Sequence, residues 1–299
     1  MTKIDFVNDR NGRTSFSVNI PERWDEFPAG IVRFIFEKYE QVMNGELTPE
    51  MLQVLTVYKL IGIRRERPSH LASRDAAIIE NVDAIRARLQ FMFEYPEKSD
   101  FPRLTFNSIQ NPLPTIRVKN RTWFGPATLC QDLTFGEFRN GALALNMFFK
   151  TEDIGNLDEC IAHIYRPGCM KANKAGRKVK PVSPGGFEDE IKAVHQIPSW
   201  QKNLIMLWFS SCIGFLQSGN IVLGGEDVDM KLLFSSGDDN NGGPAATWND
   251  LLMQISKEGT LGNMEEVDAA PLMVVLLNMW SNYKENKRNE RKIKKAKKA

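Results

Sequence analysis

Residues 122–166 read TWFGPATLCQDLTFGEFRNGALALNMFFKTEDIGNLDECIAHIYR, and this stretch decides the fold. A short strand is predicted over residues 123–129, and the polar residues Gln131 and Asp132 follow it. Thr134 and Glu137 have the spacing of a capping box, in which each side chain bonds a free backbone N–H at the start of a helix. The stretch therefore predicts a strand, a helix that opens at Thr134, and a second helix over residues 157–165.

An earlier part of the chain carries a fainter copy of this pattern. Both copies are predicted to form a strand, a short segment with acidic residues, a helix, and a second helix with an apolar face. The alignment sets Trp24 against Cys130, Gly30 against Gly136, and Leu55 against Ile161. We therefore expect two related strand-plus-helix units.

Composition and charge are those of an ordinary globular protein. The chain has 299 residues, of which 42% are hydrophobic and 25% are charged, so two or three domains are expected. The net charge is +2, but residues 284–299 hold nine Lys or Arg and two Glu. This basic tail leaves a net charge of −5 on the rest of the chain.

Cysteine usage and hydropathy indicate a cytoplasmic protein. Four cysteines stand at unrelated spacings without a CxxC pair, and the N-terminus does not resemble a signal peptide, so we expect reduced thiols. The most apolar run, residues 204–216, is shorter than the roughly 20 residues that span a bilayer. A buried core helix is the better interpretation of this run.

The remaining elements follow from periodicity and turn residues. Alternating strands on both sides of an Asn-Gly pair predict a β-hairpin over residues 4–20, and residues 105–121 also read as β structure. The fold class expected is α+β and predominantly α-helical: two related strand-plus-helix units with short β-hairpins, then a helical C-terminal region. Further helices are expected over residues 27–43, 48–61, 75–95, 187–194, 199–217 and 247–257, and from 264 into the tail.

These elements group into five segments. Residues 1–98 form an N-terminal β-hairpin with helices, and residues 99–166 form the second β-plus-helix unit. Residues 167–186 are rich in Lys, Gly and Pro and read as a mobile, solvated loop, with nucleic-acid contact through its lysines as the alternative. Residues 187–283 form the C-terminal helical region, and residues 284–299 form the basic tail.

No motif of the sequence carries a reaction, so neither catalytic residues nor a cofactor is expected. The phosphate-loop, dinucleotide, HExxH and GxSxG patterns are all missing. Cys160 and His163 are three residues apart on one helix, which allows a thiolate–imidazole pair, although packing is the commoner role. Glu226, Asp227 and Asp229 follow a strand-like run and are the only metal candidates, as carboxylate ligands of a divalent cation.

The basic tail is the candidate contact with nucleic acid or another anionic partner. Phosphate backbones attract such clusters, and the affinity falls with salt. The alternative is a tail that only confers solubility. The candidate contacts are Lys287, Arg288, Arg291, Lys292, Lys294 and Lys295.

Four motifs in this order resemble a family encoded in the structural-gene clusters of tailed phages and prophages. The first is I-P-x-x-W-x-E, which stands here at residues 20–26, and the second is D-L-T-x-G-E-F at residues 132–138. I-x-x-I-Y-R-P follows at residues 161–167. The last is W-x-x-L-L-x-x-I-[S/A]-x-x-G-x-[L/F]-G at residues 248–262. The resemblance spans most of the chain.

The resemblance implies a tail-morphogenesis factor, similar to tail assembly chaperones, that binds a tape-measure or tail-tube protein in the host cytoplasm. The family has no catalytic residues to carry over. One alternative is a structural component that stays in the virion. Two others are a metal-dependent enzyme that uses Asp227 and Asp229, and a nucleic-acid-binding protein that acts through its basic tail.

Overall fold

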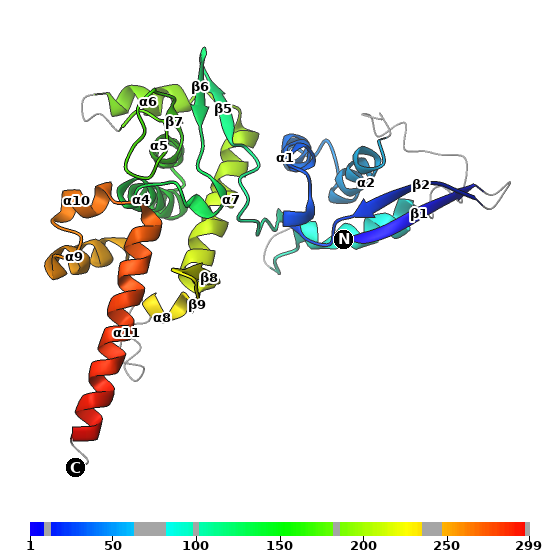
Figure 1. Ribbon diagram of the computed structural model, residues 1–299. Helices are drawn as coiled ribbons and strands as arrows, with labels where there is room; N and C mark the ends of the chain where they lie inside the picture. Colours follow the sequence, from blue (N-terminus) through cyan, green and yellow to red (C-terminus); the bar gives the residue numbers. More distant parts are fainter. Residues whose placement is uncertain (9–12, 63–81, 98–101, 182–185, 235–246, 297–299) are drawn as a thin grey trace. The chain divides into compact units, whose positions relative to one another are not determined.

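The computed structural model describes residues 1–8, 13–62, 82–97, 102–181, 186–234 and 247–296 (Figure 1). The chain is an α+β protein with predominantly helical structure and small antiparallel sheets. It divides into two compact units. Unit 1 comprises Met1–Leu113 and Pro198–Trp208, and unit 2 comprises Pro114–Ile197 and Phe209–Ala299. Among the described residues, no helix is both long enough and apolar enough to cross a bilayer.

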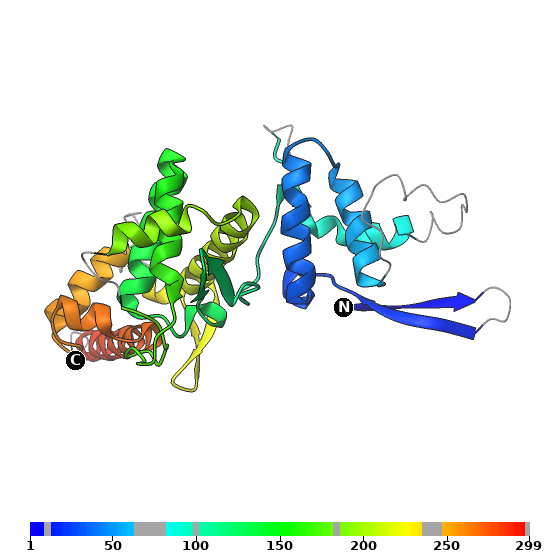
Figure 2. The same cartoon turned by 90° about the horizontal axis from the view of Figure 1, so that it is seen from above.

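Unit 1 begins with the predicted β-hairpin, in which β1 (Thr2–Asn8) pairs with β2 (Arg13–Ile20). The 3-10 helix η1 (Trp24–Glu26) leads to α1 (Ala29–Met43) and α2 (Pro49–Leu60), which lie side by side in Figure 2. Thr48 caps α2 by accepting a hydrogen bond from the N–H of Met51.

The helix predicted over residues 75–95 is only partly present. Residues 63–81 lie outside the described part of the chain, and residues 82–86 are helical. The chain then tightens into the 3-10 helix η3 (Ala87–Met92), and β3 (Phe93–Glu94) pairs with β4 (Arg103–Leu104). The prediction was wrong at its C-terminal end because this strand pairing competes with the helix. Ile85, Leu89 and Met92 are nevertheless buried, as their spacing predicted.

Unit 2 begins with a second hairpin. The strands β5 (Thr115–Val118), β6 (Arg121–Phe124) and β7 (Arg166–Pro167) form an antiparallel sheet in that order. The predicted β structure was too long in both places. Residues 105–114 form no strand, since Pro112 and Pro114 cannot donate to a ladder, and β6 ends before Gly125-Pro126.

The helices of unit 2 follow in chain order. The 3-10 helix η4 (Thr128–Cys130) precedes α4 (Phe135–Thr151) and α5 (Ile154–Ile164), which pack against each other. The elements that remain are α6 (Phe187–Val194), α7 (Ser199–Ser218), the hairpin of β8 (Asn220–Leu223) with β9 (Glu226–Asp229), α8 (Lys231–Phe234), α9 (Trp248–Glu258), α10 (Met264–Ala269) and α11 (Leu272–Ala296). The first half of α7, residues 199–208, belongs to unit 1, and the rest belongs to unit 2.

The two units share one order of elements, as the faint repeat predicted. Each has a hairpin, a 3-10 helix, a longer helix and a second helix. Gly30 is the second residue of α1, and Gly136 is the second residue of α4. Trp24 and Cys130 lie in η1 and η4. The repeat is therefore one of structure as well as of sequence.

The capping box at Thr134 is confirmed. The Thr134 N–H donates to Oε2 of Glu137 at 3.0 Å, and Thr134 Oγ1 accepts from the N–H of Glu137 at 3.3 Å. A second predicted cap is also present: Thr247 and Asp250 form a capping box at the start of α9.

The helix predicted from residue 264 into the tail is broken. It divides into α10 and α11 at Ala270-Pro271, where the chain pairs with the segment before α4. The N–H of Phe135 donates to the Ala270 carbonyl at 2.8 Å, and the N–H of Leu272 donates to the Leu133 carbonyl at 2.9 Å. These two bonds and the proline, which lacks an N–H, divert the helix.

Candidate functional site

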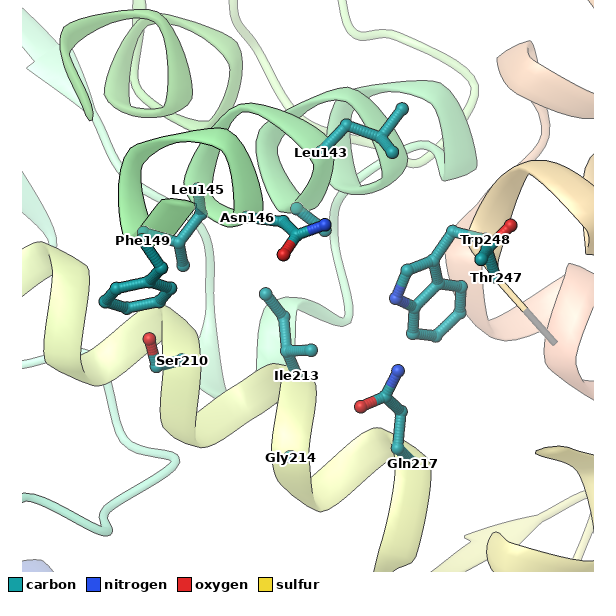
Figure 3. A pocket seen from close by; sticks show the side chains of 11 residues that line it. Leu143, Leu145, Asn146, Phe149, Ser210, Ile213, Gly214, Gln217, Thr247 and Trp248 are labelled. Atoms are coloured by element: carbon teal, nitrogen blue, oxygen red, sulfur yellow. The ribbon is translucent and has the colours of Figure 1, made fainter. Parts of the chain in front are cut away.

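A groove of about 450 Å³ lies in unit 2 where α4, α7 and α9 meet (Figure 3). We call it the α4–α7–α9 groove. None of the described residues that line it is charged. They are Ala142, Leu143, Leu145, Asn146 and Phe149 on α4, Ser210, Ile213, Gly214 and Gln217 on α7, and Thr247 and Trp248 at the start of α9.

Trp248 forms one end of the groove and is held by three phenylalanine rings. Its ring centroid lies 4.7 Å from that of Phe138, 4.9 Å from that of Phe234 and 6.3 Å from that of Phe135. Each pair meets edge to face, which suits the quadrupoles of the rings. The capping box fixes the backbone at the same point, so the indole is a rigid wall of the groove.

Two polar atoms in this apolar setting have no partner among the described residues. One is Nε1 of Trp248, whose side chain is 6% exposed, and the other is Oγ of Ser210. Figure 3 shows the indole nitrogen on the side of the ring that faces Ile213 and Gln217. A buried donor without an acceptor costs about 1–3 kcal/mol. The buried indole N–H at this end of the groove is therefore a donor without an acceptor among the described residues.

Gly214 gives the groove part of its depth. It is exposed in the middle of α7, and a Cβ built on it would meet no atom within 4 Å. Packing within the chain therefore does not require glycine there. By contrast, a Cβ on Gly141 of α4 would lie 2.9 Å from Ile164 and 3.3 Å from Phe209, so helix packing explains that glycine.

Apolar side chains are also exposed near the C-terminal end of α4. Phe149, which lines the groove, is 56% exposed, Met147 on α4 is 47% exposed, and Ile154 at the start of α5 is 43% exposed. Exposed apolar surface beside a pocket is typical of protein–protein interaction sites.

The expectation of a solvated loop over residues 167–186 holds for most of the part described, but buried residues, among them Arg177 and Val179, anchor it. Arg166 is fully buried, and it donates to the carbonyls of Ala162, Lys180 and Pro181 and pairs with Glu190. Arg177, which is 6% exposed, donates to the carbonyls of Phe124 and Ile164. The two guanidinium groups thus tie residues 166–181 to the C-terminal end of α5.

This structure leaves the lysines of the segment in solvent. Lys171, Lys174, Lys178 and Lys180 are exposed, as the sequence suggested, while Val179 is buried. Residues 182–185 lie outside the described part of the chain.

Cys160 and His163 do not form a reactive pair. Both are buried on α5, and burial raises the pKa of the Cys160 thiol far above its usual range, so it stays protonated. The His163 ring stacks on Phe187 with centroids 4.4 Å apart. Packing, the commoner role, is what the structure shows for both.

His163 should make the stability of unit 2 depend on pH. Burial, and then the charges of Arg166 and Arg139, lower its pKa from 6.5 to about 4. Between these values the unfolded chain binds a proton that the folded chain does not, so stability is lost as the pH falls through this window. From pH 7 to pH 5 we expect His163 to account for about 2 kcal/mol of the free energy of unfolding.

Urea unfolding at the two pH values measures this effect. His163→Phe keeps a ring against Phe187 but carries no titrating group, so its stability should fall by about 2 kcal/mol less than that of the wild type over the same interval. Equal pH dependence of the two proteins would contradict the prediction. Glu159, with Oε1 3.7 Å from Nε2 of His163, is unchanged in both proteins.

The three acidic metal candidates do not face one another. They lie in β9, where Glu226 points to the face of Val228, while Asp227 and Asp229 point to the opposite face. Glu226 is engaged: it accepts from Nε1 of Trp280 and from Nζ of Lys284, both at 2.8 Å. Within the described part of the chain, no group of three His, Cys, Asp or Glu side chains is placed to hold a metal ion.

The structure places the six basic candidates together on the exposed end of α11. They are Lys287, Arg288, Arg291, Lys292, Lys294 and Lys295. The sequence predicted their exposure. It did not predict the α4–α7–α9 groove, because its three helices are far apart in the chain. The available signal was Gly214 within an otherwise apolar helix.

Comparison of the chain with protein-family models, with curated proteins and with solved structures gives no match.

Proposed function

We propose that this protein is a non-enzymatic tail-morphogenesis protein of a tailed phage or prophage, and that it binds an amphipathic segment of a tape-measure or tail-tube protein in the α4–α7–α9 groove. The phage assignment depends on the four sequence motifs. The observation that supports binding is the uncharged groove with the unpartnered indole N–H of Trp248.

The chemistry of the groove favours a helical segment as its occupant. An uncharged lining receives apolar side chains without leaving a charge desolvated. The lining residues of α4 extend from Ala142 to Phe149, which is about 10 Å along the helix axis. That length matches two turns of a partner helix, which present three apolar side chains at i, i+3 or i+4, and i+7.

Gly214 would then allow the partner helix to approach α7 closely, and Trp248 would orient the partner. Without a side chain at Gly214, the partner backbone can come near the α7 surface, as at other small-residue helix contacts. One polar side chain or free carbonyl of the partner would accept the hydrogen bond from Nε1 of Trp248.

Filling the groove should abolish partner binding without harming the fold. Gly214→Leu adds a side chain whose Cβ meets no described atom within 4 Å, and it also removes the entropic cost of glycine, so we expect equal or higher stability. Capture of the tape-measure or tail-tube protein, co-expressed with the tagged full-length chain, should fall at least about tenfold, the loss that accompanies about 1.4 kcal/mol.

Gly30→Leu is the matched control. Gly30 is also an exposed helical glycine with no atom within 4 Å of a built Cβ, but it lies on α1 in unit 1. Capture by this variant should equal that of the wild type. If Gly214→Leu captures as much partner as Gly30→Leu, the groove is not the binding site. If the wild type captures neither tail protein, the proposed function itself is wrong.

Mass spectrometry of purified particles separates an assembly factor from a virion component. We expect the protein to be absent from finished particles, as befits a factor that acts during assembly. Its presence at a fixed ratio would instead support the structural alternative.

A further inference from the structure

The last three turns of α11 project from unit 2 as an isolated basic helix. Every residue from 285 to 296 is exposed, and Figure 1 shows this part of α11 extending beyond the other helices of the unit. The helix is anchored just before this segment. There Glu226 of β9 bonds to Trp280 and Lys284, and the Trp280 ring stacks on that of Tyr283 with centroids 5.5 Å apart.

Five cations of this helix make no ion pair with a described residue. They are Arg288, Arg291, Lys292, Lys294 and Lys295. Lys284 and Lys287 differ, because Lys284 pairs with Glu226 at 2.8 Å and Lys287 pairs with Glu290 at 3.3 Å. The five charges thus stand close together without an ion-pair partner among the described residues, which raises the attraction for a polyanion.

The charges are segregated around the helix axis. With a rotation of about 100° per residue, all the Lys and Arg from 284 to 295 fall within an arc of about 160°. The opposite side carries Asn286, Asn289, Ile293 and Ala296, while Glu285 and Glu290 lie at the borders of the basic arc. A merely solubilising tail does not need this separation, whereas a surface that binds from one side does.

We propose that the basic face of α11 binds the phosphate backbone of double-stranded nucleic acid without reading its sequence. From Arg288 to Lys295 the five unpaired cations span about 10 Å of the helix axis, and a duplex presents a phosphate about every 1.7 Å when both strands are counted, so about six phosphates lie along this length. The basic face carries no Asn or Gln that could read adenine, because both asparagines lie on the other side.

A duplex fits this helix better than a single strand or an acidic protein does. Single-strand binders stack bases on aromatic side chains, and residues 285–296 contain none. Trp280 and Tyr283 are occupied by each other and by Lys284 and Lys287, whose ammonium groups lie 5.4 and 5.7 Å from the ring centroids. The helix is already formed and straight, and its diameter suits the major groove.

The test is a salt titration of the full-length protein with a fluorescein-labelled 20-base-pair DNA duplex, followed by anisotropy. We expect log K to fall with log salt with a slope of about −4, as five neutralised phosphates require. Replacing Arg288, Arg291, Lys292, Lys294 and Lys295 by Gln keeps the helix propensity. This variant should bind at least roughly 30-fold more weakly near 0.1 M salt and lose most of the slope.

A charge-matched control removes five other exposed lysines: Lys59, Lys150, Lys192, Lys231 and Lys257, each replaced by Gln. Its affinity should stay within about twofold of the wild type, since none of these residues belongs to α11. Equal loss in the two variants would overturn the proposal, because the binding would then follow net charge alone. Unchanged binding by the α11 variant would overturn it as well.

Two competitors distinguish the class of ligand. An unlabelled single strand of 20 nucleotides and a poly-glutamate of equal charge should each displace the labelled duplex at least tenfold less effectively than the unlabelled duplex does. If either competes as well as the duplex, the basic face binds single strands or acidic proteins, and the proposal is wrong. This result is independent of tail-protein capture, so the two proposals can fail separately.

Discussion

Replacing Arg166 by Met should lower the free energy of unfolding by about 3–5 kcal/mol, the range found when one partner of a buried ion pair is removed. Arg166 is fully buried, and its guanidinium donates to three backbone carbonyls, those of Ala162, Lys180 and Pro181. Methionine fills much of the same volume. It leaves these carbonyls, and the carboxylate of Glu190, without their donor.

The measurement is urea unfolding followed by circular dichroism, with Arg166→Lys as the control. Lysine keeps the charge but cannot supply the planar fork that reaches several acceptors, so we expect an intermediate loss of stability. A loss below about 1 kcal/mol for Arg166→Met would contradict the assignment. It would mean that residues 166–181 contribute little to the stability of unit 2.

Trp24→Ala should destabilise unit 1 by about 3–5 kcal/mol, the usual effect of removing a large aromatic side chain from a core. The Trp24 ring is 1% exposed and lies at the centre of an aromatic cluster. Its centroid lies 5.6 Å from that of Phe27, 6.2 Å from that of Phe36, 6.1 Å from that of Phe91 and 5.1 Å from that of Phe106.

Hydrogen exchange measured by mass spectrometry can localise this effect. Amides of α1 and α2 should lose protection in Trp24→Ala, while those of α4 and α5 should keep it, because the latter belong to the core of unit 2. Trp24→Phe is the control. Nε1 of Trp24 has no acceptor among the described residues, so phenylalanine removes volume but leaves no group unpaired. Uniform loss of protection in both units would refute this prediction.

Local signals predicted much of the fold. The caps at Thr48, Thr134 and Thr247 fixed three helix starts, since the atoms that bond are at most three residues apart. Apolar periodicity also predicted buried positions such as Leu89 and Val275. These features needed no knowledge of tertiary structure.

What the sequence did not reveal depends on distant partners. A pattern of Lys, Gly and Pro reads as solvated, yet the carbonyls at the end of α5 bury Arg177. The break at Pro271 depends on pairing with Leu133 and Phe135, more than 130 residues earlier in the chain. The groove likewise required three helices to be in place, so no short window of sequence contained it.

Gly214 has a further consequence for engineering and selection. A residue other than glycine should stabilise α7 by about 0.5–1 kcal/mol, because no atom of the described residues lies within 4 Å of a Cβ built there. A library of variants at this position that is screened only for heat resistance should therefore enrich larger residues. The same library screened for partner capture should return glycine. Selection for stability would then favour a larger residue at position 214, whereas selection for binding would favour glycine, as happens where activity depends on a residue that is not the most stable choice.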